Sequence, residues 1–389
     1  MGNCPNFTRR QWLSSVAAAA GVLSTGNRLL AADSAPTAPV AVARCRSYGP
    51  ELLPAMETMF DQLGGLGRLV KGKTVAIKIN LTGSPNDRLG YLPAELAHWT
   101  HPAVIGTSIH LMSKAGAQRI RLLESGWNTA EPIEEYMLDA NWEPRDLLNA
   151  APRVEMENTN YLGNAKAYSR FTPPNGGYMF REYYLNHSYE DCDVFVSIAK
   201  LKDHATAGIT LSMKNCFGIT PCTIYGDGAG VDEPSRLPKG GRGSVIHSGR
   251  RQPSKSVPGE NDPNSPREGG YRVPRVVADL VAARPIHLAI VDGIASMAGG
   301  EGPWIRGSVP VSPGVLLAGA NCVTTDAVGA AIMGYDPMAD RGTAPFETSD
   351  STLRLAEDHG VGTRDLSRIE VIGVPISGAR FNFRLHRHG

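Results

Sequence analysis

The sequence predicts an α/β protein with a mostly parallel sheet and helices on both faces of that sheet. Short apolar, β-branched segments alternate along the chain with segments whose apolar residues recur every three or four positions. Strands separated by helices of about 10–15 residues are typical of the crossover units that build parallel sheets. One Gly/Pro-rich stretch, residues 225–271, lacks any periodicity and is predicted to be a long insertion.

The individual elements are predicted from local residue patterns in chain order. Residues 73–81 (KTVAIKINL) form a β-branched run, and residues 101–117 carry apolar residues at helical spacing. The helix at residues 324–334 is expected to be capped by Thr324 or Thr325. The predicted strands are residues 73–81, 119–126, 192–201, 286–294, 314–321 and 367–374, and the predicted helices are residues 101–117, 132–142, 274–284 and 324–334.

The N-terminus predicts export. Arg9 and Arg10 precede a short apolar stretch from Trp12 to Leu23 that is too short to span a bilayer, and this pattern resembles a twin-arginine signal. We therefore expect residues 1–32 to be a signal peptide, the twin-arginine translocation machinery to be a partner, and the protein to be periplasmic or otherwise exported. An ordinary amphipathic or disordered N-terminus is the alternative.

The rest of the chain is expected to be one domain. Residues 33–72 are predicted to be a linker followed by a first helix, and residues 73–389 a single α/β domain that contains the insertion.

The composition excludes several classes of protein. The chain has 389 residues and a formal net charge of +1, which gives no sign of a nucleic-acid partner. Beyond the signal, no apolar run reaches the roughly 18 residues that a transmembrane helix needs, so we expect no stable membrane span. The cysteines form no CxxC pair, which disfavours an iron–sulfur cluster or a zinc ribbon.

Polar residues stand where the predicted strands end. Asn80, Glu124, Lys200 and Asp292 each follow an apolar run, and Lys78 interrupts a strand two positions before Asn80, so that both face the same side. In open α/β sheets, ligands bind at the carboxyl ends of the strands. Strand ends are also polar simply because they meet solvent, but the group of five favours a functional cluster.

A second group lies in residues 196–218. Lys200 and Lys202 alternate at the end of a buried strand, His204 lies in the following turn, and Lys214 and Asn215 come next. Lysine binds anionic groups, acts as a base when desolvated, or attaches a cofactor, and histidine titrates near neutral pH. A glycine-rich loop that contains Glu301 has the composition of a ligand-binding loop.

Five segments resemble the domain-of-unknown-function family 362: VAIKINL, THPAVIGTSIHLMSKAGAQRIRLLESG, AKLKDHATAGITLSMKNCFG, VDGIASMAGGEGP and GVLLAGANCVTTDAVGAAIMGYDP. They occur in the family's order and cover about residues 73–337. Many relatives also carry ferredoxin-like cysteine clusters, which this sequence lacks. An iron–sulfur electron-transfer role is therefore not implied.

A remoter and partial resemblance links His204-x3-Gly208-x5-Lys214 to the lysine segment of nickel-pincer lactate racemases. In that family the lysine tethers a pyridinium cofactor, and a nearby histidine helps proton or hydride exchange. This chain departs from the pattern at Leu211 and Ser212, where the family has paired glycines. The next histidine after Lys214 is His247, so no nickel ligand is evident.

These observations lead to one main hypothesis: an exported enzyme that acts on a small anionic substrate. A metal- or cofactor-dependent isomerase or oxidoreductase is left open, with a metal or a covalently tethered cofactor. The alternatives are a non-catalytic periplasmic ligand-binding or accessory protein and, disfavoured, an electron-transfer partner. The expected catalytic residues are His204, Lys214 and Lys200, the expected ligand-binding residues Lys78, Asn80, Lys202, Asn215 and Glu301, and the expected metal ligands Glu124 and Asp292.

The hypothesis makes a geometric demand. The strand-end residues, His204 and Lys214 should line one cavity, and the hypothesis fails if Lys200 and Lys214 lie on opposite sides of the sheet.

Overall fold

The computed structural model describes residues 35–127, 130–229, 237–238 and 240–386. The predicted signal peptide, residues 1–32, lies outside the described residues. No helix in the described part of the chain combines the length and the apolar character needed to cross a membrane.

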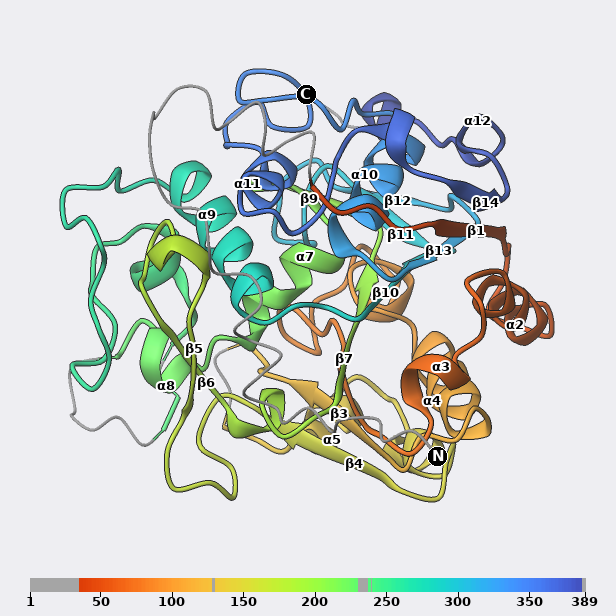
Figure 1. The fold of residues 1–389 in the computed structure, drawn as a ribbon, viewed down its shortest axis with the longest axis horizontal. Helices are drawn as coiled ribbons and strands as arrows, with labels where there is room; N and C mark the ends of the chain where they lie inside the picture. The colour runs from red at the N-terminus through yellow and green to blue at the C-terminus, as the bar shows by residue number, and fades with distance from the viewer. Residues whose placement is uncertain (1–34, 128–129, 230–236, 239, 387–389) are drawn as a thin grey trace, which may run out of the picture.

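One eight-stranded sheet organises the molecule (Figure 1). All neighbouring strands pair in parallel except β13, which is antiparallel to both of its neighbours, so the predicted α/β fold with a mostly parallel sheet is confirmed. From one edge to the other, the strands are β14 (Val371–Gly373), β1 (Val40–Arg44), β13 (Val315–Gly319), β10 (Leu288–Gly293), β7 (Val194–Lys200), β2 (Thr74–Lys78), β3 (Arg119–Glu124) and β4 (Val154–Asn158).

Strand β7 lies inside the sheet, between β10 and β2, and all of its residues are buried. Its sequence VFVSIAK is almost continuously apolar, as expected for a strand that is covered on both faces. Parallel pairing brings the carboxyl ends of β2, β3, β7 and β10 to one edge, where the candidate site residues were expected.

Helices cover both faces of the sheet, as predicted. In Figure 1, α2 and α4 lie to the right of the sheet and α7, α9 and α11 to its left. The first face packs α2 (Leu52–Gln62), α4 (Pro102–Lys114), α5 (Ile133–Asp139) and α6 (Pro144–Leu148) in one apolar core. The second face packs α7 (Ser212–Asn215), α9 (Gly269–Ala283), α10 (Cys322–Ile332) and α11 (Thr352–Asp358) in another.

The remaining elements are short. Three small hairpins pair β5 (Ser169–Phe171) with β6 (Tyr183–Leu185), β8 (Lys202–His204) with β9 (Gly208–Thr210), and β11 (Ser296–Ala298) with β12 (Val309–Val311). The other helices and turns are α3 (Gly67–Val70), α8 (Cys222–Tyr225), α12 (Ile376–Ala379), η1 (Ala94–Leu96), η2 (Pro174–Gly176), η3 (His187–Tyr189), η4 (Cys216–Ile219), η5 (Gly243–His247), η6 (Leu366–Arg368) and η7 (Phe383–His386).

Three expectations need correction. Residues 33–72 are not only a linker and a helix, because β1 is a strand of the main sheet. The N-cap of α10 is Asn321, whose side chain accepts hydrogen bonds from two backbone amides, and not Thr324 or Thr325. The insertion at residues 225–271 is not wholly irregular, because it contains η5 and the start of α9.

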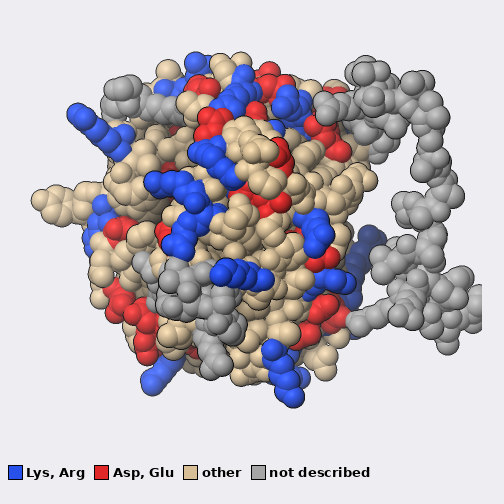
Figure 2. Space-filling model, turned by 90° about the vertical axis from the view of Figure 1, so that its left-hand side faces the viewer, with Lys and Arg blue, Asp and Glu red and all other residues tan. Residues whose placement is uncertain are grey.

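Figure 2 shows the face of the molecule on the left-hand side of Figure 1. Basic and acidic side chains are interspersed over this face, as the formal net charge of +1 leads one to expect.

Candidate functional site

A cavity of about 550 Å³ lies beyond the carboxyl ends of β2 and β3. Its walls come from these strand ends, the β8–β9 hairpin, α7, residues 241–247 of the insertion, and the loop that carries Glu301 and Trp304. This volume is in the range of cavities that enclose a small molecule.

The structure brings most of the predicted residues together. The predicted residues that line this cavity are Lys78, Asn80, Glu124, Lys202, His204, Lys214, Asn215 and Glu301. Lys200 and Asp292 do not line it, so the expectation that all strand-end residues share one cavity is wrong for these two.

Lys200 and Asp292 instead form a buried ion pair on the opposite face of the sheet. Along β7, Ile198 and Lys200 point toward the core of α2 and α4, whereas Ser197 points toward α7 and donates to the carbonyl of Ser212. The Lys200 ammonium lies 2.8 Å from Asp292, whose carboxylate also accepts from the Tyr48 hydroxyl and the His101 backbone amide. Lys200 and Lys214 therefore lie on opposite sides of the sheet, so the hypothesis of one cavity that includes Lys200 and Asp292 is wrong. Asp292 is committed to a structural network.

Lys78 and Glu124 form a second buried pair, at the floor of the cavity. Their nitrogen and oxygen lie 2.6 Å apart. Burial lowers the pKa of Lys78, and the charge of Glu124 opposes that shift. Glu124 also accepts backbone hydrogen bonds from Leu81 at 2.8 Å and Ser125 at 2.9 Å.

Glu124 and Asp292, the expected metal ligands, do not form a metal-binding arrangement. Both oxygens of Glu124 already accept hydrogen bonds, and Asp292 lies on the other face. Over the described ranges, no group of three or more His, Cys, Asp or Glu side chains has a metal-binding arrangement.

Asn215 connects the cavity floor to the helix that carries Lys214. Its amide nitrogen donates to the carbonyl of Lys78 at 3.2 Å and to Ser197 Oγ at 3.0 Å, and its amide oxygen accepts from Lys78 Nζ at 3.3 Å. These bonds fix the short helix α7 against β2 and β7. Asn215 thus positions Lys214, its neighbour in sequence, over the cavity.

Asp326 of α10 holds the other end of α7. Its carboxylate accepts from the backbone amides of Ser212 and Met213, both at 2.9 Å, and from the Ser212 hydroxyl. These are free N–H groups of the first turn, which a carboxylate satisfies well. Burial raises the pKa of Asp326 to about 7, although the three donors oppose the shift.

This shift predicts a pH-dependent stability. Between pH 3.8, the ordinary pKa of the side chain, and about 7, the folded protein binds more protons at Asp326 than the unfolded chain does. The free energy of unfolding should therefore fall as the pH rises through this window, by at most about 4 kcal/mol. In Asp326→Asn this part of the slope should be absent when urea unfolding is compared between pH 4.5 and 7.5 with the unsubstituted protein. Parallel pH profiles for the two proteins would contradict the prediction.

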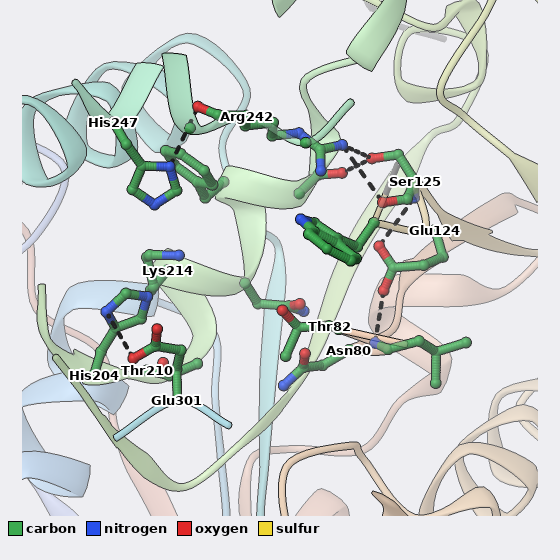
Figure 3. A pocket seen from close by; sticks show the side chains of 18 of the residues that line it. Asn80, Thr82, Glu124, Ser125, His204, Thr210, Lys214, Arg242, His247 and Glu301 are labelled. Atoms are coloured by element: carbon green, nitrogen blue, oxygen red, sulfur yellow. Dashed lines mark hydrogen bonds and ion pairs between the residues drawn. The ribbon is translucent and has the colours of Figure 1, made fainter. Parts of the chain in front are cut away.

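Lys214 is the lysine that faces the cavity without a polar partner. Among the described residues no carboxylate lies within ion-pair distance of its ammonium, which lies 4.3 Å from the centroid of the Phe217 ring. Burial lowers the pKa of Lys214 to about 8, against the opposing charge of Glu301. Figure 3 shows Lys214 between His204 and Glu301 on one side and His247 on the other.

The two histidines that flank Lys214 differ in the role of Nδ1, which accepts hydrogen bonds in His204 and donates one in His247. His204 Nδ1 accepts from the backbone amides of Thr206 at 3.0 Å and Ala207 at 3.2 Å. We therefore assign the proton of the neutral His204 ring to Nε2. Burial lowers the pKa of His204 well below its usual value, so the ring is neutral near pH 7.

His247 has the reverse arrangement. Its Nδ1 lies 3.3 Å from the carbonyl oxygen of Arg242 and donates to it, which leaves a lone pair on Nε2. In Figure 3 the second nitrogen of this ring points toward Lys214. Burial, together with the charge of Lys214, lowers the pKa of His247 to about 4. The site thus combines an N–H donor, an amine and a nitrogen acceptor.

Lys202 and Glu301 hold the glycine-rich loop in place. The Lys202 ammonium donates to the backbone carbonyls of His98 at 2.8 Å and Glu301 at 2.6 Å. The Glu301 carboxylate accepts from the Ala205 amide at 2.9 Å and from the Trp304 indole at 3.2 Å. Burial raises the pKa of Glu301, but the charge of His204 in its protonated form and the Ala205 and Trp304 donors outweigh it and hold this pKa below its usual value. The loop lines the cavity, as its composition suggested.

Arg242 is a site residue that the sequence did not reveal. Its buried guanidinium donates to Ser125 Oγ at 2.6 Å, to Thr220 through the backbone oxygen at 2.8 Å, and to Asn160 Oδ1 at 3.2 Å. These acceptors are all neutral, and no described carboxylate lies within 4 Å of this guanidinium. The available signal was the segment GGRGS, in which glycines surround one arginine.

The carboxylates of the cavity wall are held by backbone amides or by Lys78. Asp87 accepts from the Ser84 amide at 2.7 Å, Asp227 accepts from the Ser244 amide, and Glu124 pairs with Lys78. Lys214 and Arg242 have no carboxylate partner among the described residues. The cavity therefore offers two cationic groups to an anion.

Comparisons with known proteins agree with the resemblance seen in the sequence. The model of a family described as "Domain of unknown function (DUF362)" matches residues 75–331. A thylakoid-associated protein of Synechocystis sp. is 28% identical over 187 residues, which are 47% of this chain and 50% of that protein. The chain thus spans about half the length of this curated relative.

Two solved structures share a remote likeness. One is the lactate racemase apoprotein from Thermoanaerobacterium thermosaccharolyticum, with a TM-score of 0.36 and 11% identity, covering 72% of this chain and 55% of that one. The other is a protein from Thermotoga maritima, with a TM-score of 0.30 and 14% identity, covering 63% of this chain and 51% of that one. The matched family range, residues 75–331, contains every cavity residue discussed above.

Proposed function

This chain belongs to the DUF362 family, and we propose that it is an enzyme that acts on a small anionic substrate bound in the cavity beneath Lys214 and Arg242. The observation that carries the proposal is the pairing of charges in the cavity wall. Among the described residues no carboxylate lies within 4 Å of either cation: Arg242 donates only to neutral oxygens, and the Lys214 ammonium lies over the Phe217 ring. Arg242 is buried and Lys214 is half-buried. Enclosing a cation without a counter-ion is costly, and an anionic ligand bound over both groups would offset that cost.

The side chains around Lys214 suit proton transfer. Its pKa of about 8 lies near physiological pH, where a group works well as a general acid or base. His247 Nε2 can accept a proton, and His204 Nε2–H can donate a hydrogen bond to a negative oxygen of the substrate. Arg242 would bind the anionic group and hold the substrate beside the amine.

A tethered cofactor is a second candidate for the role of Lys214. The partial resemblance to lactate racemases implies a lysine-linked cofactor, and His247, which the sequence spacing did not mark as a nickel ligand, faces Lys214. Lys214 would carry the attachment, and such a cofactor would supply hydride exchange. The intact mass of protein purified from its own host tests this candidate, because a tethered group adds mass at Lys214.

A non-catalytic ligand-binding protein is the alternative, and it would use the same two cations without turnover. Export by the twin-arginine machinery remains a proposal that rests on Arg9 and Arg10. Retention of an Arg9→Lys/Arg10→Lys variant in the cytoplasmic fraction would support it, and unchanged export would contradict it.

Anion binding provides the direct test of the proposed site. Oxamate, a small carboxylate, should bind to the full chain in isothermal titration calorimetry. Arg242→Met should weaken this affinity by about 10- to 100-fold, because one or two charge-assisted hydrogen bonds are lost. The exposed Arg153 supplies the matched control, and Arg153→Met should bind as the unsubstituted protein does. Unchanged affinity in a folded Arg242→Met protein, checked by circular dichroism, would overturn the proposal.

A further inference from the structure

We infer that Lys214 forms a covalent imine with the carbonyl carbon of its substrate, and that the substrate class is a small 2-oxo acid. The inference rests on the proposed anion-binding function and deepens it. It assigns the carboxylate of the acid to Arg242 and its neighbouring ketone to Lys214.

The environment of the half-buried Lys214 differs from that of the three buried lysines. Lys78 and Lys200 each pair with a carboxylate, and Lys202 donates to two carbonyl oxygens. The amines of these three lysines form structural hydrogen bonds and ion pairs. In the part of the chain that the structure describes, the Lys214 amine has no hydrogen-bond or ion-pair partner. It lies over the Phe217 ring and faces the cavity, so it is the lysine that is placed to attack a ligand.

The reactive form of this amine is accessible at neutral pH. With a pKa of about 8, roughly one-tenth of Lys214 is uncharged at pH 7. A solvent-exposed lysine with a pKa of about 10.4 has a neutral fraction more than 100-fold smaller. Desolvated lysines beside other cations are the usual imine-forming residues, and Arg242 and Lys78 are cations whose charges lower the pKa of Lys214.

The flanking histidines provide the proton transfers that imine formation needs. His247 Nε2 takes a proton from the Lys214 ammonium, and the neutral amine attacks the ketone carbon, whose π electrons move to oxygen. A proton then shifts from nitrogen to this oxygen, while His204 Nε2–H donates a hydrogen bond to it. The protonated His247 returns its proton to the resulting hydroxyl, which leaves as water as the nitrogen lone pair forms the C=N bond. The sum is ketone plus ammonium giving iminium plus water.

The size and charge of the cavity agree with this class of substrate. About 550 Å³ exceeds the volume of a three-carbon acid, so a longer side chain is accommodated. The carboxylate of the substrate would pair with the cavity cations, which have no carboxylate partner among the described residues. The ketone, adjacent to the carboxylate, would lie between Arg242 and Lys214, which face the same cavity (Figure 3).

Reductive trapping tests the inference on the full chain. The protein is incubated with pyruvate and sodium borohydride, digested and mapped by mass spectrometry. Hydride from borohydride reduces the C=N bond, so Lys214 should carry a 1-carboxyethyl group, with labelling at least about tenfold above that of the exposed Lys166. Lys214→Arg should abolish the label, Lys166→Arg should retain it, and excess oxamate, which has an amide in place of the ketone, should suppress it.

The outcomes separate this inference from the proposed function. A label on Lys214 that oxamate suppresses supports both. Oxamate binding without a pyruvate label overturns the imine and leaves the anion site intact. Failure of both ligands to bind overturns the proposed function and the imine together. Equal labelling of Lys166 and Lys214, or a Lys214 already modified before pyruvate is added, also overturns the imine.

Discussion

Replacing Lys214 with methionine should reduce turnover of a small anionic substrate by about 10²- to 10⁴-fold, which is the usual contribution of a positioned acid–base group. Methionine keeps the length and apolar contacts of the stem while it removes the amine. The measurement is exchange of carbon-bound hydrogen with solvent deuterium, followed by NMR on a panel of small 2-oxo and 2-hydroxy acids.

The matched variant is Lys214→Arg, which keeps the positive charge but not a titratable amine. It should bind oxamate within a fewfold of the unsubstituted affinity and still lose exchange. If both variants exchange hydrogen as fast as the unsubstituted protein, Lys214 has no catalytic role. If the unsubstituted protein binds oxamate but exchanges no panel member, the non-catalytic alternative is favoured.

The exchange rate should also depend on pH with a defined sign. A step that needs the neutral amine speeds up as the pH rises toward about 8 and then levels off. Burial in the cavity wall lowers the pKa of Lys214, the charge of Glu301 raises it, and the charges of Arg242 and Lys78 lower it. His204 and His247 beside the amine are neutral. Glu301→Gln removes the negative charge that stabilises the ammonium, so it should shift the midpoint to lower pH. A midpoint unchanged by Glu301→Gln would contradict this account.

Removing the carboxylate of Asp292 should lower the free energy of unfolding by about 3–5 kcal/mol. In Asp292→Ala the Lys200 ammonium stays buried without its counter-ion, and such charges are strongly destabilising. The Tyr48 hydroxyl and the backbone amides of His101 and Ile294 lose the same acceptor. Urea unfolding monitored by circular dichroism measures the loss.

A double variant tests the cause of this loss. Lys200→Met/Asp292→Leu removes both charges and should recover a large part of the stability, because apolar replacement of a buried pair is often nearly neutral. Oxamate affinity should be the same in this double variant and in the unsubstituted protein, since the pair lies across the sheet from the cavity. A large loss of affinity in the folded double variant would contradict the separation of the two sites.

Much of the fold could be predicted from the sequence because it depends on local patterns. Strand β7 follows from its nearly continuous apolar run, and helix α4 follows from the helical spacing of its apolar residues. Strand β1 was missed, because its alternating Val and Ala residues in VAVAR are a weak strand signal beside an Ala/Pro linker. The reversed direction of β13 was not predictable either, since a strand's own sequence does not encode its orientation.

The candidate site also contains residues that the sequence predicted correctly and one that it misplaced. Lys78, Asn80 and Glu124 were found because parallel strands bring their carboxyl ends to one edge, which is a rule that sequence reasoning can apply. Lys200 was misplaced because it lies on the face of β7 opposite Ser197 and α7, where Asp292 holds its ammonium. The alternation rule shows that two side chains share a face, but it does not show which face carries the cavity.

By itself, the sequence determined the family, the α/β architecture and the segment that supplies His204 and Lys214, because each depends on residues close together in the chain. Only the tertiary structure decided which charges are neutralised. Lys200 and Asp292 are 92 residues apart yet form a buried pair, whereas Lys214 and Arg242 meet in a cavity without carboxylate partners among the described residues. The free energy of a charge depends on its surroundings in space, and contacts between distant segments set those surroundings.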